Sequence, residues 1–295
     1  MAGREGQRST PARRVSSFRN VALLMLIPVL GLILLFAYSF VRTQIPAPKP
    51  KTSEARIIPA PPPAPRASRP APPPSHRGDI VLILDDVGFD HQPLVDAMRI
   101  DPNLNFAVLP NGSRSADFAR ELDGRGFELL CHLPMEPVDY PRTSPGPHAI
   151  LTSMSDDEIA KTTRENVAAV PHARGVNNHM GSRATADSRV MTSVLGALPK
   201  GMYFIDSRTT GDSIAARTAH AMNVRTASRS VFLDDVQTEP AIRRQLAALS
   251  AAAAEHGVAV GIGHMYPQTV RVLREEAPEL RTRGFRFVRA STVVN

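Results

Sequence analysis

Tryptophan is absent from this 295-residue sequence, which contains only four tyrosines and one cysteine. A single cysteine excludes a disulfide within the chain, which is compatible with a bacterial periplasm but does not by itself indicate one. Cys131 lies in an apolar run, where a buried and unreactive thiol is the default interpretation. The shortage of large aromatic side chains argues against a sugar site that is built mainly from stacked rings.

The basic character of the chain, with a net charge of +7, is confined to its N-terminal quarter. Residues 1–78 contain twelve of the 35 basic residues and two of the 28 acidic residues, so residues 79–295 carry 23 basic and 26 acidic side chains. The part with a globular composition is therefore mildly acidic. We expect no nucleic-acid partner, because the high isoelectric point belongs to the N-terminal segment.

Residues 21–41 form an uncharged apolar run of the length that spans a hydrocarbon core of ~30 Å. Five arginines precede the run and basic residues are sparser after it, so the positive-inside rule places residues 1–20 in the cytoplasm. A cleaved signal peptide is the alternative, but its apolar core is normally only ~7–15 residues long. The sequence predicts one transmembrane helix in the inner (cytoplasmic) membrane, with the C-terminal domain in the periplasm.

Residues 42–78 are dominated by proline, alanine and scattered arginine, with twelve prolines between positions 45 and 78. This composition cannot bury a core and favours extended polyproline II structure. At ~3.1 Å per residue the segment reaches at most on the order of 100 Å. We predict a disordered linker that holds the folded domain away from the bilayer.

From residue 79 to residue 295, short apolar runs alternate with amphipathic stretches. Helices are predicted from Ser155 to Val170, with Ser155 and Glu158 at capping-box spacing, and from residue 238 to His256, before Gly257. The alternation predicts an α/β fold with a parallel sheet, arranged as a distorted or partly open (β/α) barrel. The predicted strands contain the runs at 80–84, 104–109, 127–131, 175–176, 202–205, 230–233, 258–263 and 285–288.

Acidic, amide and histidine side chains follow most of these runs. Because the carboxyl ends of parallel strands share one face, we expect these side chains to converge at one mouth. Two histidines and a carboxylate form an open ligand set for a divalent metal such as zinc, and further acids and histidines can transfer protons. Each residue taken alone would more simply cap a helix or face solvent. In chain order they are Asp85, Asp86, His132, Asn177, Asn178, His179, Asp206, Asp234, Asp235 and His264.

Six strings in this order resemble the divergent branch of the polysaccharide deacetylases: LILDDVG, CHLPMEP, GVNNHMGS, FIDSR, FLDD and GIGH. The resemblance covers essentially all of residues 79–295. It implies a barrel of the glycoside hydrolase/deacetylase type, related to the NodB-like carbohydrate esterases. Those enzymes remove acetyl groups from glycans with a metal that is held by one aspartate and two histidines.

The resemblance implies roles for individual residues. Asp85 and Asp86 match the first motif in order, as catalytic base and metal ligand. His132 matches the first histidine of the second motif, but Glu136 stands where the second histidine is expected. Either Glu136 is a ligand or His179 supplies the imidazole. We prefer the set Asp86, His132 and His179, because the proline at position 134 disfavours a helical pairing of residues 132 and 136.

The last motif matches His264, which is expected to act as the acid, and Asp206 is expected to orient or tune a histidine. The arginine of the ordinary third motif is missing, and Asn178 and His179 occupy its region. Further residues are expected to contact a polysaccharide or peptidoglycan-like glycan, and helix capping is expected for Asp234 and Asp235. The expected substrate-binding residues are Asn178, Glu136, Ser182 and Arg208.

Three functions are compatible with these patterns. The first is a membrane-anchored, metal-dependent hydrolase that removes acetyl or similar acyl groups from a cell-envelope polysaccharide. The alternative is a catalytically inactive barrel that binds glycans or regulates envelope remodelling, which the replaced motif residues favour. A phosphatase that uses Asp85 and Asp86 is less well supported, since no glycine-rich phosphate loop follows them.

Overall fold

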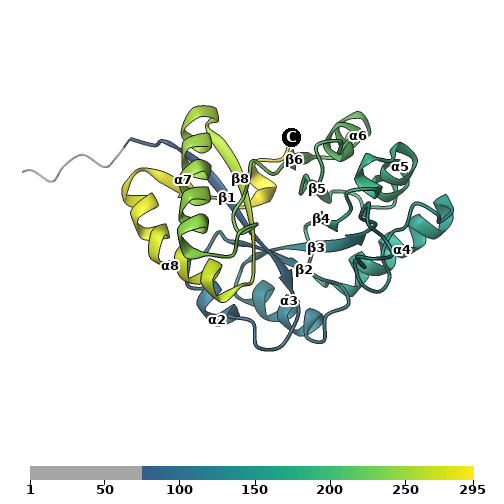
Figure 1. Cartoon of the computed structure of the whole chain (residues 1–295), viewed down its shortest axis with the longest axis horizontal. Helices are drawn as coiled ribbons and strands as arrows, with labels where there is room; N and C mark the ends of the chain where they lie inside the picture. Colours follow the sequence, from purple (N-terminus) through teal and green to yellow (C-terminus); the bar gives the residue numbers. More distant parts are fainter. Residues whose placement is uncertain (1–74) are drawn as a thin grey trace, which may run out of the picture. The chain divides into compact units, whose positions relative to one another are not determined.

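The computed structural model describes residues 75–295, and its strands form one curled sheet (Figure 1). Every pairing between strands is parallel. The strands are β1 (Gly78–Val87), β2 (Asn105–Val108), β3 (Glu128–Met135), β4 (Gly175–Met180), β5 (Tyr203–Asp206), β6 (Thr226–Ser228), β7 (Val231–Phe232), β8 (Val258–His264) and β9 (Phe285–Phe287).

The strand order is β6-β5-β4-β3-β2-β1-β8-β7, and β9 pairs with the amino end of β1. Within residues 75–295, the two end strands β6 and β7 are not paired with each other, so the curled sheet is an open half-barrel. The predicted parallel α/β fold and the partly open barrel are thereby confirmed. Strand β6 was not predicted, because its three residues Thr-Ala-Ser form no apolar run.

Helices cover one face of the sheet (Figure 1). The predicted capping box is present at α4, where the Glu158 amide donates to Ser155 and the Ser155 amide donates back to Glu158. Helix α7 ends at Gly257, whose φ of 81° is the left-handed conformation typical of a helix C-terminus. The helices are α2 (Leu94–Ala97), α3 (Ser115–Gly124), α4 (Asp156–Ala169), α5 (Ser188–Gly196), α6 (Ala215–Ala221), α7 (Glu239–His256) and α8 (Pro267–Thr282), with short 3₁₀ turns η1 (Ala184–Ala186) and η2 (Ala290–Thr292).

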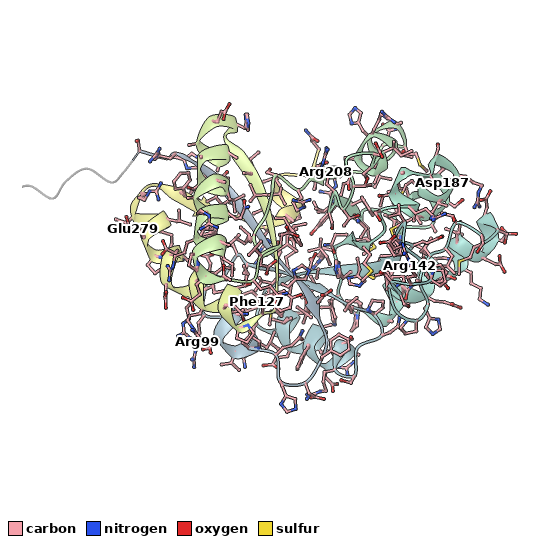
Figure 2. All side chains as sticks on the ribbon, in the orientation of Figure 1. Arg99, Phe127, Arg142, Asp187, Arg208 and Glu279 are labelled. Carbon is pink, nitrogen blue, oxygen red and sulfur yellow. The ribbon has the colours of Figure 1, made fainter. Side chains whose placement is uncertain are left out.

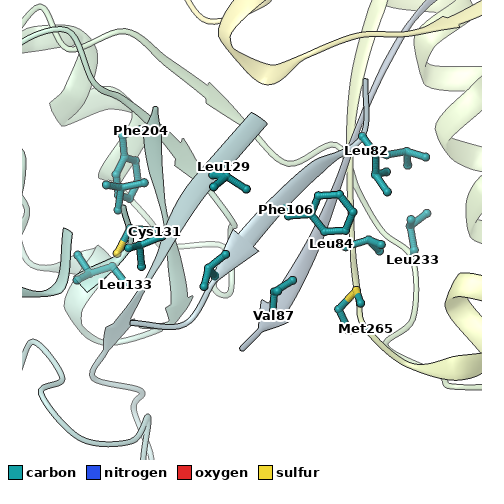
Figure 3. Close-up of a cluster of buried hydrophobic side chains, with 14 of the residues drawn as sticks. Leu82, Leu84, Val87, Phe106, Leu129, Cys131, Leu133, Phe204, Leu233 and Met265 are labelled. Atoms are coloured by element: carbon teal, nitrogen blue, oxygen red, sulfur yellow. The ribbon is translucent and has the colours of Figure 1, made fainter. Parts of the chain in front are cut away.

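The sheet separates two hydrophobic clusters. The outer cluster contains Leu82 and Leu84 of β1 and fills the space between sheet and helices, as the labelled side chains in Figure 3 show. The inner cluster contains Val81 and Ile83 of β1 and is closed by residues of the C-terminal segment. Successive residues of a strand point to opposite faces of the sheet. Because the residues that point to each face are apolar, the central strands are apolar on both sides.

The predicted cytoplasmic segment 1–20 and membrane span 21–41 lie outside the described residues, as does the linker 42–78 up to residue 74. Among residues 75–295, none of the helices is long and apolar enough to cross a membrane.

Side chains fill the layers of the described domain (Figure 2), where Arg208 lies between the α7–α8 side and the α5–α6 side of the fold.

Candidate metal centre and cleft

The inner face of the sheet changes from apolar to polar at the carboxyl ends of its strands. On β1, the inward series Val81 and Ile83 ends in Asp85. On β8, the equivalent series ends in His264, which lies beside Asp85 in the strand register. The two-residue period that builds the inner core therefore also delivers a carboxylate and an imidazole to one mouth. His132 on β3 follows Leu130 in the same way.

Asp86 reaches the same mouth because β1 is irregular at this point. Leu84 lies opposite Phe106 of β2, and Val87 lies opposite Val108, so β1 carries one extra residue. Asp86 has a φ of 60°, a left-handed conformation that aspartate tolerates better than most residues. Such a bulge re-aims a side chain. Two adjacent carboxylates can thus share one face, which a regular strand does not allow.

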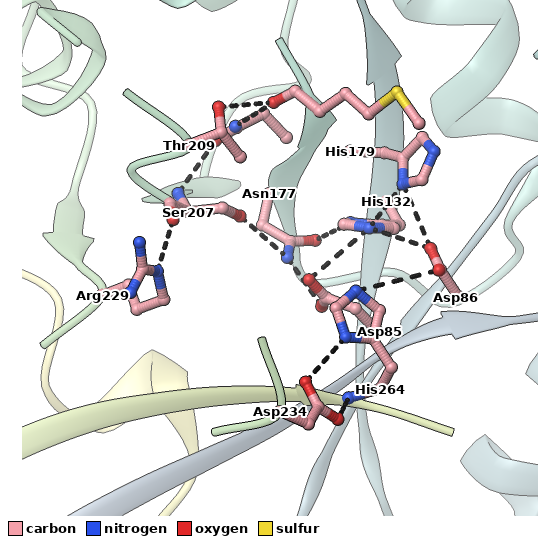
Figure 4. Close-up of polar contacts among 12 residues, drawn as sticks. Asp85, Asp86, His132, Asn177, His179, Ser207, Thr209, Arg229, Asp234 and His264 are labelled. Atoms are coloured by element: carbon pink, nitrogen blue, oxygen red, sulfur yellow. Dashed lines mark hydrogen bonds and ion pairs between the residues drawn. The ribbon is translucent and has the colours of Figure 1, made fainter. Parts of the chain in front are cut away.

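Asp86, His132 and His179 bring three ligand atoms together (Figure 4). Asp86 Oδ1 lies 3.3 Å from His132 Nε2 and 3.1 Å from His179 Nδ1. The two imidazole nitrogens are 3.2 Å apart. The three residues come from β1, β3 and β4, so only the sheet brings them together. This is the ligand set that we preferred from the sequence.

The donor atoms fit a small divalent metal ion. Asp86 Oδ1 is buried, and although two imidazole nitrogens lie close to it, it makes no well-aligned hydrogen bond within the described residues. Donors that bind one metal at ~2.0–2.1 Å with tetrahedral angles are roughly 3.3 Å apart. The observed separations match this spacing. One carboxylate and two imidazoles also leave coordination positions open for water and substrate.

Asn177 connects the metal ligands to the neighbouring acid. Its Nδ2 lies 2.9 Å from Asp85 Oδ1 and donates to that carboxylate. This fixes the amide so that Oδ1 accepts from His132 Nδ1, 3.0 Å away. His132 therefore presents Nε2 to Asp86 and His179. Neighbours that hold the second ring nitrogen of a ligand histidine set its tautomer and orientation.

Charge and burial separate the two aspartates. Burial raises the pKa of Asp85, although the imidazoles of His132 and His264 partly oppose this. For Asp86, burial is outweighed by contacts with His132 and His179, which hold the pKa of its carboxyl well below its usual range. Asp86 is thus suited to bind a cation, and Asp85 to exchange a proton. The roles expected from the first motif, a base at Asp85 and a metal ligand at Asp86, stay predictions that these environments favour.

His264 is oriented by a buried carboxylate. Asp234 Oδ1 lies 2.9 Å from His264 Nδ1, and Asp234 Oδ2 accepts from the His264 amide and from the Thr269 hydroxyl. Burial lowers the pKa of His264, but Asp234 and the nearby carboxylates of Asp85 and Asp86 outweigh it and raise the pKa to about 9. His264 is therefore a protonated group at neutral pH. Its Nε2 lies 3.8 Å from Asp86 Oδ2, at the metal centre.

The expectation that Asp206 orients a histidine is corrected by the structure. Its carboxylate accepts from the Arg208 amide and from the Ser213 hydroxyl, and it therefore shapes the loop after β5. Asp206 continues the outward-facing residues of its strand, because the inward positions are Tyr203 and Ile205. The histidine partner is Asp234, for which only helix capping was expected.

The alternative ligand Glu136 is held away from the metal centre. Its Oε2 accepts from the Thr152 amide and hydroxyl, at 2.5 and 2.7 Å, and its Oε1 lies 3.3 Å from Arg183 Nε. Ser182 accepts from the Val138 amide. Neither Glu136 nor Ser182 lines the neighbouring cleft, and the contacts of both side chains stabilise loops, so their contact with a substrate stays a prediction.

A cleft of about 760 Å³ opens beside the metal centre. Two of the expected substrate-binding residues, Asn178 and Arg208, line it. The side chain of Asn178 also donates to the Met180 carbonyl and accepts from the backbone amide of Ser207. Sequence reasoning missed Arg229, which donates to the carbonyls of Ser207 and Arg208. Other lining residues include His132, His179, Thr209, Phe232, Asp235, His264 and Tyr266.

Asn177 and Asp234 are the functional residues whose roles were not anticipated. Both lay in the quoted strings, but the sequence is compatible with a sugar-binding groove or a turn for Asn177 and favours a helix cap for Asp234. The pairing register could have found Asn177, since it lies directly opposite His132. Asp234 follows the short strand β7, whose pairing with β8 brings it beside His264.

The fold and the site together define an α/β half-barrel with a carboxylate–histidine centre at the carboxyl ends of its strands. The family model for divergent polysaccharide deacetylases matches residues 82–294. The chain belongs to this family, as the motifs had indicated.

Similar proteins are found in several bacteria. The chain is 35% identical over 219 residues to the uncharacterized protein YibQ of Escherichia coli, covering 74% of this chain and 68% of YibQ. It is 34% identical over 196 residues to an uncharacterized protein of Haemophilus influenzae, covering 66% and 69% of the two chains. The crystal structure of the uncharacterized protein ATU2773 from Agrobacterium tumefaciens has the same fold, with a TM-score of 0.71 at 23% identity, covering 75% of this chain and 90% of that one.

Proposed function

We propose that this protein is a metal-dependent hydrolase that removes acetyl or similar acyl groups from a cell-envelope glycan. The observation that carries the proposal is that the ligand atoms of Asp86, His132 and His179 lie close together, and that the buried Oδ1 of Asp86 makes no hydrogen bond within the described residues. A proton-accepting acid and a protonated histidine flank this centre. Membership of the polysaccharide deacetylase family supports a glycan as the substrate class.

Asp86, His132 and His179 would hold the ion, and we favour zinc because two imidazoles and one carboxylate are ligands that zinc prefers. A bound divalent ion would polarise the acyl carbonyl and the attacking water. The neighbouring side chains supply the proton transfers. Asp85 is placed to accept a proton from the water, whose oxygen forms a bond to the acyl carbon.

His264 is placed to complete the reaction. As the bond between the acyl carbon and the sugar nitrogen or oxygen breaks, His264 Nε2 donates its proton to the leaving atom. Asp234 keeps this nitrogen directed to the centre through its bond to Nδ1, 2.9 Å long. The products are the carboxylic acid and a sugar amine or hydroxyl, and transfer of the proton from Asp85 to His264 restores both groups.

The proposed location of the reaction rests on the N-terminal sequence. We propose that residues 21–41 anchor the chain in the inner membrane and that the linker 42–78 carries the domain into the periplasm, toward peptidoglycan-like glycans. A fusion of alkaline phosphatase to the C-terminus tests this topology, because that enzyme folds into its active form only outside the cytoplasm. Inactive fusions with normal expression would contradict the proposed orientation.

The enzymatic proposal is tested on the full-length protein with chitooligosaccharides and peptidoglycan fragments, by measuring released acetate. We expect activity that is lost with a chelator, restored by zinc, and abolished in Asp86→Ala. Activity that persists undiminished without metal would refute the scheme. A chain that holds no metal but still binds glycan would instead establish the non-catalytic module.

A further inference from the structure

A second cavity, of about 280 Å³, borders the metal centre. His179 lines both this cavity and the cleft, and the other residues around the two spaces differ. A proposed metal ligand therefore borders both spaces. The mechanism described above makes no use of this second cavity.

The walls of the second cavity are mainly apolar. Phe89 follows β1, Leu109 follows β2, and Pro134 lies in β3 directly opposite His179 in the register. The cavity thus lies over the ends of β1 to β3, whereas residues in or directly after β4 to β8 line most of the cleft. Two prolines of the loop after β3, at positions 145 and 147, complete the apolar wall.

The polar side chains at this cavity are occupied by the loops that form it. Asn111 Nδ2 donates to the Pro147 carbonyl at 2.9 Å, which ties the loop after β2 to the loop after β3. Ser144 accepts from the Gly146 amide at 3.2 Å. The cavity is therefore preformed, and it offers a ligand mostly carbon surface. Phe89, which is 45% exposed, forms its rim.

We propose that this cavity receives the acyl chain of the substrate, and that it accommodates chains longer than acetyl. This inference rests on the proposed hydrolase function. The scissile carbonyl must lie at the metal centre, with the sugar on one side and the acyl chain on the other. The sugar is polar and suits the larger cleft, with its charged and amide side chains, whereas an alkyl chain suits the apolar cavity beside His179.

The volume indicates a longer chain. A methyl group is roughly as large as a water molecule, whose share of the liquid is ~30 Å³. The methyl of an acetyl group would therefore fill only a small part of 280 Å³. Each further methylene that is buried should strengthen binding about fourfold, which corresponds to ~0.8 kcal/mol per methylene.

The test separates binding from turnover on zinc-loaded, full-length protein. Alkyl hydroxamic acids from acetyl to hexanoyl, which chelate zinc, are titrated calorimetrically, and p-nitrophenyl esters of the same acids are assayed for hydrolysis. We expect affinity to rise about fourfold per methylene until the cavity is filled. Leu109→Phe, which narrows the cavity, should leave acetohydroxamate binding within about twofold and abolish the gain for longer chains.

Phe89→Ala should reduce the gain per methylene, and Val95→Ala, another exposed apolar residue but on α2, serves as the matched control. Equal affinity for all chain lengths would overturn the acyl-chain assignment. A second result would also overturn it: loss of chitooligosaccharide binding in Phe89→Ala, combined with hydroxamate affinity that does not depend on chain length. This result would place a sugar against Phe89. Hydroxamate affinity that rises with chain length without hydrolysis of any ester would support the cavity and refute the proposed hydrolase.

Discussion

Asn177 offers a test of how the metal centre is assembled, because one amide serves two partners. Its Oδ1 accepts from His132 Nδ1, and its Nδ2 donates to Asp85. The side chain is fully buried. Asn177→Leu preserves the approximate volume and removes both bonds, whereas Asn177→Asp keeps an acceptor for His132 and places a second carboxylate against Asp85.

The two substitutions should therefore fail in different ways. Leaving His132 Nδ1 and Asp85 without their buried partner should cost ~1–3 kcal/mol of stability for each group in Asn177→Leu. Loss of a side chain that orients a metal ligand typically lowers metal affinity ~10–100-fold. Asn177→Asp should retain metal, but like-charge repulsion should raise the pKa of Asp85 further. Asp85 acts when it is deprotonated. The acidic limb of the pH–rate profile should therefore lie at higher pH in Asn177→Asp than in the unmodified protein.

The assay is zinc affinity by competition with a chromogenic chelator, combined with thermal unfolding and the pH profile of hydrolysis. Asn105→Leu is the matched control, because Asn105 is equally buried and bonds the Leu82 carbonyl and the Ala290 amide at the opposite end of β2. Asn105→Leu should lower stability and leave zinc affinity unchanged. If Asn177→Leu bound zinc as tightly as Asn105→Leu, the assignment of Asn177 would be refuted.

Three further predictions concern other parts of the domain. Asp234→Asn should lower the His264 pKa from about 9. Because His264 acts while protonated, the alkaline limb of the pH–rate profile should then move to lower pH. An alkaline limb that does not move would argue against His264 as the acid. His179→Gln should lower the bound zinc measured by atomic absorption, whereas Glu136→Gln should leave it unchanged; the reverse pattern would restore Glu136 as ligand. Ser155→Ala should reduce unfolding free energy by ~1 kcal/mol in urea titrations, through loss of the α4 capping box, and full stability would show that the cap is redundant.

The sequence was a good guide wherever local patterns decide structure. Short apolar runs between amphipathic segments identified β1, β3 and β8, and capping signals placed the ends of α4 and α7. The same runs located the polar residues at the carboxyl ends of the strands. The anchor at 21–41 and the linker at 42–78 remain predictions from the sequence, because their residues lie largely outside the described domain.

Pairing and side-chain direction needed the tertiary structure. The sequence left Glu136 and His179 as alternative metal ligands. The two-residue period of a strand does not show which of these side chains is held away from the metal centre by contacts with a loop. The loops around Thr152 and Arg183 hold Glu136, and the register of β3 with β4 brings His179 to His132. Asp206 was misassigned for a related reason, since it falls on the outer face of its strand.

The family motifs and the positions of most strands along the chain could thus be predicted from the sequence, because hydrophobic periodicity and strand-end residues are local features. The shape of the centre was decided by the folded sheet. A bulge turns Asp86 beside Asp85, a register places Asn177 between base and ligand, and the pairing of β7 with β8 gives His264 its carboxylate. The contacts of Asn177 with Asp85 and of His264 with Asp234 span 92 and 30 positions of the chain, so only packing of the whole half-barrel sets them.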